Sequence, residues 1–577
     1  MEKVHLIFRN LRTMGAFMLT LFVFALCSYD AYAQTSVRGK ITDTKGEPVT
    51  GAAVVVKNTK KYSLSDLKGE YRVEAVKGDI LEISFLGMET QELKYMGQAV
   101  LDVVMKDNVS ALDEIVVVGY GAQQKASLTG SISQIKGSEL LKTPSTNISS
   151  ILGGRVAGLA SVQESGQPGA DYAGLRIRGS RAGVNYIVDG MPRSINDINP
   201  NDIESVSVLK DASSAAVYGL QSAGGVIIIT TKKGKSEESK ISYKTSIGAS
   251  VNANFPKFLD GPSYAYWYNK ANELDGRAVV FTEEQVALML NNDPTDGWGN
   301  TDWAKETYGV GMTQQHSITA NGGTDKIKYF ASLGYMDQLG NIKNFTYKRY
   351  NLRSNIEAKI AKSLTLTLGV AGTVGDTRSA GYSAGGSSAA GVSSAPWLSV
   401  SEQVAYAHPY LPMEIDGIPV ASRNAYGNPI NPVAAANLSG KNKTISTSLQ
   451  SNIALRWDIP WVKGLNVKFT GAYDHTFTYA KNFSTPYDLM FETVPNSTTT
   501  NISFTKRTDA RNQTDRTLGE GFTQWGRMVT QSSASYTNVF GKHSIDALVL
   551  METRDYKSNK FAAYGKGFYF EEQIGRA

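Results

Sequence analysis

The chain has 577 residues and a formal net charge of +6 at pH 7, with Lys and Arg spread along its whole length. A nucleic-acid surface gathers basic side chains on one face, so this charge pattern excludes nucleic acid as the expected partner. The 55 glycines and 29 tyrosines, with many Ser, Thr and Asn residues, favour strands and tight turns. The first expectation is therefore a mainly β protein.

Residues 1–33 predict a secretory signal peptide. An apolar run from Met14 to Leu26 follows three basic residues, and Ala31–Ala33 then supplies an A-x-A cleavage site before Gln34. A run of about 13 apolar residues is too short for a membrane anchor, which needs about 20 residues in a helix. We expect Sec-dependent export and cleavage between Ala33 and Gln34. The basic residues are Lys3, Arg9 and Arg12.

The single cysteine, Cys27, lies inside this signal, so the mature chain is expected to have no thiol and no disulfide. Leu26 precedes it, where a lipoprotein signal usually has a small residue. No later segment is apolar enough for a membrane helix, so membrane insertion would have to use β-strands.

Residues 34–107 predict a small β-sandwich of short strands separated by turns, one of them at Ser65–Gly69. The segment resembles the carboxypeptidase-regulatory-like, transthyretin-like domain through a GxxxDxxGxPxxGA pattern. Turn geometry alone explains its glycines and prolines, and it lacks catalytic machinery, so we interpret it as a packing or docking module. The residues of the pattern are Gly39, Asp43, Gly46, Pro48, Gly51 and Ala52.

Residues 108–132 combine an apolar strand with a polar linker. Four β-branched residues in a row, Ile115–Val118, suit extended pairing with the sheet edge of another chain. The stretch resembles the segment of SusC/RagA-type TonB-dependent transporters that contains the TonB box. The alternative is an internal strand of the neighbouring domain. The resemblance implies a TonB box of Asp113, Glu114, Ile115, Val116, Val117 and Val118.

Residues 133–235 resemble the whole plug domain of the same family in the order and spacing of their motifs. Four predicted strands (175–178, 185–188, 206–209 and 226–231) alternate with helical pieces at 149–156 and 212–218, which indicates a compact α+β domain. Gly190, Gly224 and Gly225 stand where a tight turn or a close backbone approach leaves no room for a side chain.

The plug motifs implied by the resemblance lie in "RG", "DG", "KD", "YG" and "GG" pairs. Their residues are Arg178, Gly179, Asp189, Gly190, Lys210, Asp211, Tyr218, Gly219 and Gly225. One pair departs from the family, which usually has Ser-Arg where this chain has Leu220-Gln221. Any plug contact that this arginine makes in relatives is therefore in doubt here.

Residues 236–577 change to long segments of period-two alternation. In one of them, Leu364, Leu366, Leu368 and Val370 share a face opposite polar threonines, and the segments at 327–335 and 465–474 alternate in the same way. Soluble sandwiches alternate too, but their strands are usually about five or six residues, whereas a tilted membrane strand needs about 9–11. The pattern favours a transmembrane barrel with an apolar outside and a polar inside.

Long aromatic or polar segments separate these strands and are expected to form extracellular loops. We predict short helices at 262–275 and 281–292, and loops at 379–396 and 483–524.

The sequence shows no catalytic constellation, so we expect no enzymatic activity, no cofactor and no metal. The histidines after the signal (His316, His408, His475 and His543) are far apart, with no carboxylate or cysteine at ligand spacing. The acidic stretch at 293–302 faintly resembles a Ca²⁺ loop without the required spacing, so a turn-rich loop is the better interpretation. Loop aromatics could stack on sugar rings or could simply pack, and they name no binding residue.

The family resemblance implies energised import across the outer membrane of a Gram-negative, Bacteroidetes-like bacterium. Its partners would be TonB with ExbB and ExbD, a SusD-like surface lipoprotein and outer-membrane lipid. An oligosaccharide is the expected substrate, and a peptide importer of the RagA kind is the first alternative. A siderophore or cobalamin receptor is disfavoured by the regulatory-like domain before the plug. A non-transporting surface glycan-binding protein, an adhesin or a peptidase would not explain the plug.

The barrel is expected to be incomplete in this chain. The resemblance implies 22 strands, whereas about 340 residues follow Lys235 and supply roughly ten recognisable strands with long loops. The chain ends at Glu571–Ala577 without a terminal aromatic strand. An open edge would expose backbone N–H and C=O groups to lipid, so we expect a truncated sequence, with a small closed barrel of about ten strands as the alternative.

Overall fold

The structure is a computed structural model that describes residues 35–568, except 45, 58, 60, 86–87, 107–114, 119–120, 125–130, 144, 382–395, 424–428, 493–499, 510–514 and 542. The expected signal with Ala33 and Gln34, the residues Asp113 and Glu114, and the segment 571–577 lie outside the described residues. The chain divides into two compact units, 1–116 with 122–128, and 117–121 with 129–577. The domain boundaries expected from the sequence remain predictions.

The first unit contains the β-sandwich. Tyr71 and Val73 on one sheet and Leu81 and Ile83 on the other are buried, because alternate side chains of each strand point into a shared core. One sheet has the order β4-β1-β7 and the other β3-β2-β5-β6. The strands are β1 Thr35–Thr42, β2 Ala53–Val56, β3 Tyr62–Leu64, β4 Glu70–Ala75, β5 Ile80–Ser84, β6 Gln91–Lys94 and β7 Val103–Val104.

The second unit begins with the α+β domain, here called the plug. A five-stranded sheet of order β10-β15-β16-β13-β14 forms its centre, and a β11–β12 hairpin lies beside it. Its strands are β10 Ile132–Lys136, β11 Leu159–Gln163, β12 Ala173–Ile177, β13 Asn185–Val188, β14 Met191–Pro192, β15 Ile203–Leu209 and β16 Val226–Thr231. Its helices are α3 Gly137–Leu140, α4 Ile148–Leu152 and α5 Ala212–Ala215, with 3₁₀ turns at Pro200–Asp202, Ala216–Tyr218 and Leu220–Ser222.

Two differences from the sequence expectation concern the plug helices. The first helix was expected to reach Val156, but α4 ends at Leu152 because Gly153 and Gly154 follow and Gly154 has a φ of 73°. The second was expected as one helix to Tyr218, but α5 tightens to a 3₁₀ turn after Ala215.

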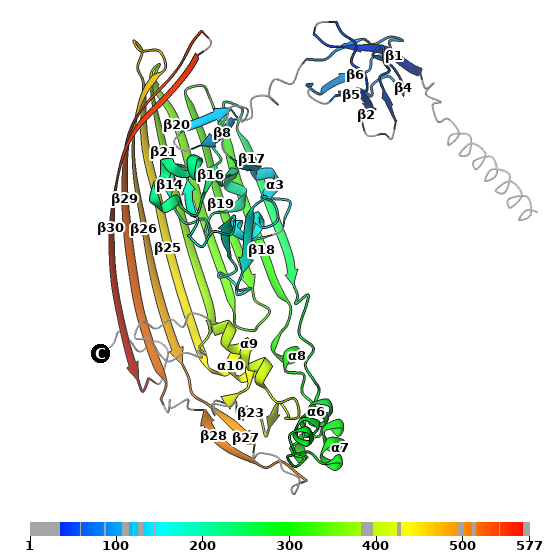
Figure 1. Cartoon of the computed structure of the whole chain (residues 1–577), viewed down its shortest axis with the longest axis vertical. Coiled ribbons are helices and arrows are strands. Elements are labelled where there is room, and N and C mark those ends of the chain that lie inside the picture. The colour runs from blue at the N-terminus through cyan, green and yellow to red at the C-terminus, as the bar shows by residue number, and fades with distance from the viewer. Residues whose placement is uncertain are drawn as a thin grey trace, which may run out of the picture. The chain divides into compact units, whose positions relative to one another are not determined.

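Nine long antiparallel strands form the wall, a curved sheet that holds the plug on one face (Figure 1). Their order is β17-β18-β19-β20-β21-β25-β26-β29-β30, so β17 and β30 are the edges of the described sheet. The strands are β17 Lys240–Ser250, β18 Gly311–Gly323, β19 Ile327–Leu339, β20 Thr346–Ala361, β21 Leu364–Ala380, β25 Gly440–Asp458, β26 Leu465–Ser484, β29 Thr517–Phe540 and β30 His543–Lys566.

The two faces of the wall differ as the alternation predicts. On β26, Phe469 and Tyr473 are about half exposed, whereas Thr470 and Asp474 are 5% and 4% exposed on the face toward the plug. On β21, Leu368 and Val370 lie on the exposed face. The structure therefore confirms a mainly β protein with a sandwich, an α+β plug and an incomplete barrel wall.

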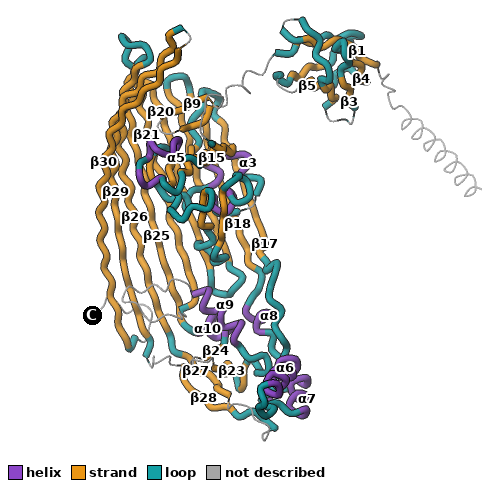
Figure 2. The backbone as a smooth tube through the Cα atoms, in the orientation of Figure 1, coloured by secondary structure: helices purple, strands orange, loops and turns teal. Residues whose placement is uncertain are grey.

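The connections at the far end of the wall from the plug carry the helices (Figure 2). They are α6 Gly261–Leu274, α7 Glu283–Asn291, α8 Trp303–Thr307, α9 Pro396–Tyr406 and α10 Pro432–Leu438, with a 3₁₀ turn at Pro294–Asp296. The Thr282 side chain accepts a hydrogen bond from Gln285 N, and the Gln285 side chain accepts one from Thr282 N, which forms a capping box and fixes the start of α7. None of the described helices is both long and apolar enough to cross a membrane.

The prediction of one irregular loop at 483–524 was wrong in part. Strand β26 continues to Ser484, β29 starts at Thr517, and a further hairpin forms between them. Leu489 and Phe491 are buried and alternate with the less buried Asp488, Met490 and Glu492, a pattern that the polar residues around this strand hide in the sequence. The additional strands are β22 Glu414–Ile415, β23 Ile418–Arg423, β24 Pro429–Ile430, β27 Tyr487–Glu492 and β28 Phe504–Asp509.

Candidate functional site: the contact between plug and wall

A two-residue turn of the plug lies against the wall. Asp189 and Gly190 join β13 to β14 with φ angles of 51° and 85°, and two positive values are typical of the type I′ turn that Asp-Gly favours. The Asp189 carboxylate accepts hydrogen bonds from Thr231 N at 2.9 Å and Thr231 Oγ1 at 2.7 Å, which ties the turn to the end of β16. The hairpin therefore projects in a fixed direction.

The residues after this turn enter the wall. Met191 packs against Ala472 of β26 and Val529 of β29 in a small buried cluster. Gln531 of β29 donates a hydrogen bond to Gly190 O at 3.3 Å. The turn thus lies against two neighbouring wall strands, 281 or more residues away in sequence.

Arg193 follows the hairpin and makes a buried ion pair with Asp474 of β26. Its Nη2 lies 2.7 Å from Asp474 Oδ1, its Nε lies 3.1 Å from both carboxylate oxygens, and Nη2 also donates to Ser451 O at 3.2 Å. Arg527 of β29 binds the second oxygen of Asp474. The exposed fractions of the Arg193, Asp474 and Arg527 side chains are 2%, 5% and 10%.

This arrangement, the Arg193–Asp474–Arg527 cluster, places one carboxylate between two guanidinium groups away from water. Loss of the Asp474 carboxylate would leave two buried guanidinium groups uncompensated, which costs about 3–5 kcal/mol, although the cluster as a whole contributes little compared with apolar packing. Bidentate geometry also fixes the relative orientation of its partners. The cluster therefore fixes the position and orientation in which the plug docks, and it adds little to the free energy of docking.

A second group of buried arginines, on β20, contacts Asp189 of the same turn and other segments of the plug. Arg353 lies 3.6 Å from Asp189 Oδ2 and 3.6 Å from Asp202 Oδ2. Arg349, 2% exposed, donates to Asn196 O and Thr146 O. Burial raises the pKa of Asp202, and the nearby Arg353 guanidinium opposes that rise. The arginine contacts are long, but two asparagines of the same strand make short ones: Asn355 donates to Lys232 O at 2.7 Å and Asn351 donates to Asp197 O at 2.9 Å. Strand β20 therefore also holds the plug directly.

The remaining plug motifs come together inside the plug. Arg178, with φ of 50°, forms an ion pair with Asp211, whose Oδ2 also accepts from Ser131 N at 2.5 Å. That backbone hydrogen bond is the main reason why the pKa of Asp211 lies below its usual value, with Arg178 adding to it. Lys210 N donates to Ser131 O. The Arg178-Gly179 and Lys210-Asp211 motifs thus hold Ser131, where the chain enters the plug.

Three further motif residues shape the plug's interior. Tyr218 is buried in the cluster that contains Val226 and Ile228, and Gly219 after it has a φ of 73°. Gly225 has a φ of 90°, and a Cβ there would lie 2.6 Å from Ile177 Cδ1. Their role is to build the plug, and the assignment of Arg178, Gly179 and the other motif residues to transport remains a prediction.

Gln221, from the Leu220-Gln221 pair that differs from the family, has a hydrogen-bond partner in the wall. Gln221 Oε1 accepts a hydrogen bond at 2.8 Å from Arg554 of β30, and Arg554 also pairs with Glu552. Leu220 is 98% exposed. An arginine at position 221 would face Arg554, so glutamine suits this wall.

We predict that Gln221→Arg weakens plug docking slightly, by about 0.5–1 kcal/mol, because it sets two partly exposed guanidinium groups side by side. The urea midpoint of protection of the plug from protease measures the effect. Leu220→Arg adds the same charge at an exposed neighbouring position and is expected to leave the midpoint unchanged. Arg554→Gln should restore the midpoint of Gln221→Arg, and an equal loss in both single variants would contradict the contact.

Among the expected TonB-box residues, Ile115–Val118 are described and form strand β8. β8 pairs with β9, Gly121–Gln124, and this two-stranded sheet joins no other sheet in the described part of the chain. β8 therefore keeps one edge that pairs with no described strand. The TonB-box assignment remains a prediction.

The histidines and the acidic loop have ordinary structural partners. His316 Nδ1 lies 2.7 Å from Tyr243 Oη, and His408 Nδ1 lies 2.9 Å from Glu492 Oε1, a carboxylate contact that sequence spacing did not reveal. In the acidic loop, Asp296 accepts from Trp298 N and Asp302 caps α8. No group of three or more His, Cys, Asp or Glu side chains that could hold a metal ion occurs among the residues that the structure describes.

Two family descriptions match the chain. Residues 124–226 match the TonB-dependent Receptor Plug Domain, and residues 37–117 match the CarboxypepD_reg-like domain. These matches cover the plug and the β-sandwich.

Curated relatives and solved structures agree with these matches. TonB-dependent receptor SusC of Bacteroides thetaiotaomicron is 37% identical over 347 residues, which are 57% of this chain and 33% of the relative. TonB-dependent receptor P39 of Formosa agariphila is 30% identical over 471 residues, 80% of this chain and 42% of the relative. The RagAB peptide importer in its open-open state superposes with a TM-score of 0.62 at 26% identity, covering 80% of this chain and 51% of that chain.

The chain thus spans between 33% and 42% of the length of these curated relatives. The family matches identify a plug domain at 124–226 and a CarboxypepD_reg-like domain at 37–117 within this span. The recognition made from the sequence is therefore confirmed: this chain is homologous to TonB-dependent receptors of the SusC/RagA type and carries their plug and CarboxypepD_reg-like domains.

Proposed function

We propose that this chain acts in TonB-dependent import of a nutrient, an oligosaccharide, across the bacterial outer membrane. The observation that carries the proposal is a plug held on the inner face of a barrel wall by buried polar contacts, with the Arg193–Asp474–Arg527 cluster at their centre. A plug of this kind blocks a pore, and contacts of this kind can be exchanged for water when the plug moves.

The proposed energy input is a pull on β8. An extended strand with an unused edge can add to the sheet of TonB through backbone hydrogen bonds. Force applied there would reach the plug through the linker at 119–130 and then the Ser131 contacts with Lys210 and Asp211. ExbB and ExbD would energise TonB, and a SusD-like lipoprotein would cover the outer face, as the family resemblance implies.

The substrate class rests on relatives rather than on geometry. The family resemblance implies an oligosaccharide, and RagAB is a peptide importer, so a peptide is the second candidate. No catalytic step is proposed.

Growth of a strain that lacks the gene tests the function. We expect slow growth on at least one oligosaccharide as sole carbon source and normal growth on its monosaccharide and on peptides, because only the larger molecule needs energised import. Complementation with the full reading frame should restore growth. Loss of growth on peptides alone would shift the substrate to the RagA kind, and normal growth on every substrate would contradict import.

A further inference from the structure

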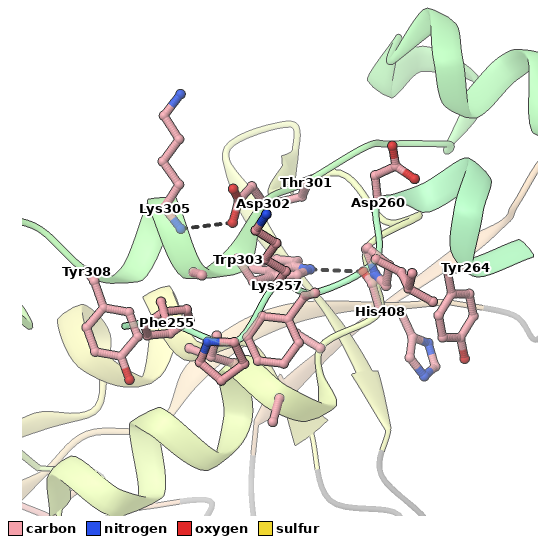
Figure 3. Close-up of a pocket in the computed structure, with 18 of the residues that line it drawn as sticks. Phe255, Lys257, Asp260, Tyr264, Thr301, Asp302, Trp303, Lys305, Tyr308 and His408 are labelled. Carbon is pink, nitrogen blue, oxygen red and sulfur yellow. Dashed lines mark hydrogen bonds between the residues drawn. The ribbon is translucent and has the colours of Figure 1, made fainter. Parts of the chain in front are cut away.

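A cavity of 1020 Å³ lies in the loop region, apart from the contact between plug and wall. Three segments and Tyr264 of α6 line it: residues 252–260 before α6, residues 300–309 around α8, and residues 404–409 at the end of α9 (Figure 3). Its volume is at the upper end of the roughly 300–1,000 Å³ of small-molecule sites, which is room for a ligand of several rings.

Aromatic side chains keep open surface in this cavity. Phe255, Phe258 and Tyr406 line it and are 36%, 46% and 53% exposed. Phe255 packs edge-on against Phe258 at 5.9 Å and against Tyr308 at 4.9 Å between ring centroids, so the rings support one another while part of each remains free. Large apolar rings left in contact with water favour a ligand that covers them.

The floor of the cavity is fixed before any ligand binds. Trp303 is 4% exposed, and its Nε1 donates to His408 O at 2.9 Å (Figure 3). Tyr308 Oη donates to Ser401 Oγ at 2.7 Å, and Thr301 Oγ1 donates to Leu411 O at 2.6 Å. These bonds join the α8 and α9 segments, so little conformational entropy would be lost on binding.

The charged groups of the lining balance one another. Lys257 and Lys305 are exposed cations for which the described residues provide no ion-pair partner, and Asp260 and Asp302 cap α6 and α8 through one oxygen each. Hydrogen bonding from Ser263 lowers the pKa of Asp260, which keeps this carboxylate an acceptor. With two cations and two anions, the lining repels neither cationic nor anionic ligands overall. A ligand hydroxyl group can donate to a carboxylate and accept from an ammonium group.

The lining disfavours an extended peptide. It consists of parts of helices α6, α8 and α9 and of irregular segments, so its described residues offer no long strand edge for backbone pairing. Open aromatic faces combined with balanced donors and acceptors instead suit a neutral ring with many hydroxyl groups.

We propose that this cavity binds a neutral oligosaccharide through Phe255, Phe258 and Tyr406, with Lys257 and the aspartates contacting hydroxyl groups. The inference rests on the proposed import function for its biological role and names the substrate class at a site separate from the plug. The cavity would capture the sugar among the loops before it reaches the plug.

Binding to the purified full chain in detergent tests the proposal. Isothermal titration calorimetry would use neutral gluco-, manno- and galacto-hexasaccharides, an oligogalacturonate, and a mixture of tryptic peptides. The variants are Phe258→Ala and Tyr406→Ala, alone and combined, because both rings are exposed and their removal leaves the floor intact. Tyr266→Ala is the matched control, since Tyr266 is 60% exposed on α6 and does not line the cavity.

We expect one neutral hexasaccharide to bind, with a loss of affinity of roughly tenfold for each ring removed and no change for Tyr266→Ala. Preferential binding of the oligogalacturonate or of peptides would overturn the proposal, as would equal sugar binding by the wild type and the double variant. Uptake of the same sugar by cells separates the proposal of import from the proposal of sugar binding in the cavity. Ring-dependent binding without uptake would contradict import and support the cavity, whereas uptake with ring-independent binding would contradict only the cavity.

Discussion

Deletion of Ile115–Val118 is expected to abolish energised uptake while leaving surface binding of the nutrient unchanged. The four residues are β-branched, and β8 pairs only with the short β9 in the described part of the chain. A strand of this kind can add to another sheet through its backbone, which is how we expect TonB to bind it. Uptake of radiolabelled nutrient by energised cells, and binding to the same cells with an uncoupler, measure the two properties separately.

Two substitutions distinguish backbone pairing from side-chain recognition. Val117→Pro removes one backbone N–H and resists strand pairing, so uptake should fall as far as it does in the deletion. Val117→Thr keeps the β-branched shape and the N–H, so uptake should stay close to that of the wild type. Full uptake in the deletion would show that energy enters elsewhere, and normal uptake in Val117→Pro would exclude a strand-addition mechanism.

Local sequence patterns were sufficient for elements of the plug, the loops and the wall whose structure depends on residues close in sequence. Strands β13 and β16 have the bounds expected from their apolar runs, and α6 and α7 lie within one or two residues of the predicted helices. The Asp189-Gly190 turn follows from the φ preferences of those two residues alone. Alternation with period two also predicted the exposed and plug-facing sides of β21 and β26.

Contacts between distant segments could not be predicted from local patterns. Arg193 and Asp474 are 281 residues apart, and neither a strand period nor a turn motif indicates that they meet. The same holds for His408 and Glu492, 84 residues apart, and for Gln221 and Arg554. Such pairs depend on which distant segments the folded chain brings together. The register of the whole wall sheet determines those neighbours. The alternation at 465–474 predicts the polar face for Asp474 but not its partner.

Asp474→Asn is expected to destabilise plug docking by about 3–5 kcal/mol, because it keeps the shape of the side chain but leaves Arg193 and Arg527 buried without a counter-charge. The urea midpoint for protease release of the plug would fall accordingly, and ion conductance in planar bilayers would rise as the plug loosens. Asp458→Asn is the control, since Asp458 pairs with Arg456 of the same strand, β25, at side-chain exposures of 50% and 53%. That exposed pair should contribute less than about 1 kcal/mol.

Replacement of the whole cluster separates charge compensation from packing. The triple variant Arg193→Met, Asp474→Leu and Arg527→Met removes the three charges of the cluster and fills the same space with apolar side chains. It should therefore recover most of the docking stability lost in Asp474→Asn. It should nevertheless transport poorly, because apolar contacts cannot exchange their partners for water when TonB pulls on the plug. A triple variant as unstable as Asp474→Asn would show that the cluster acts through packing, and one that transports normally would show that polar docking is not needed for release.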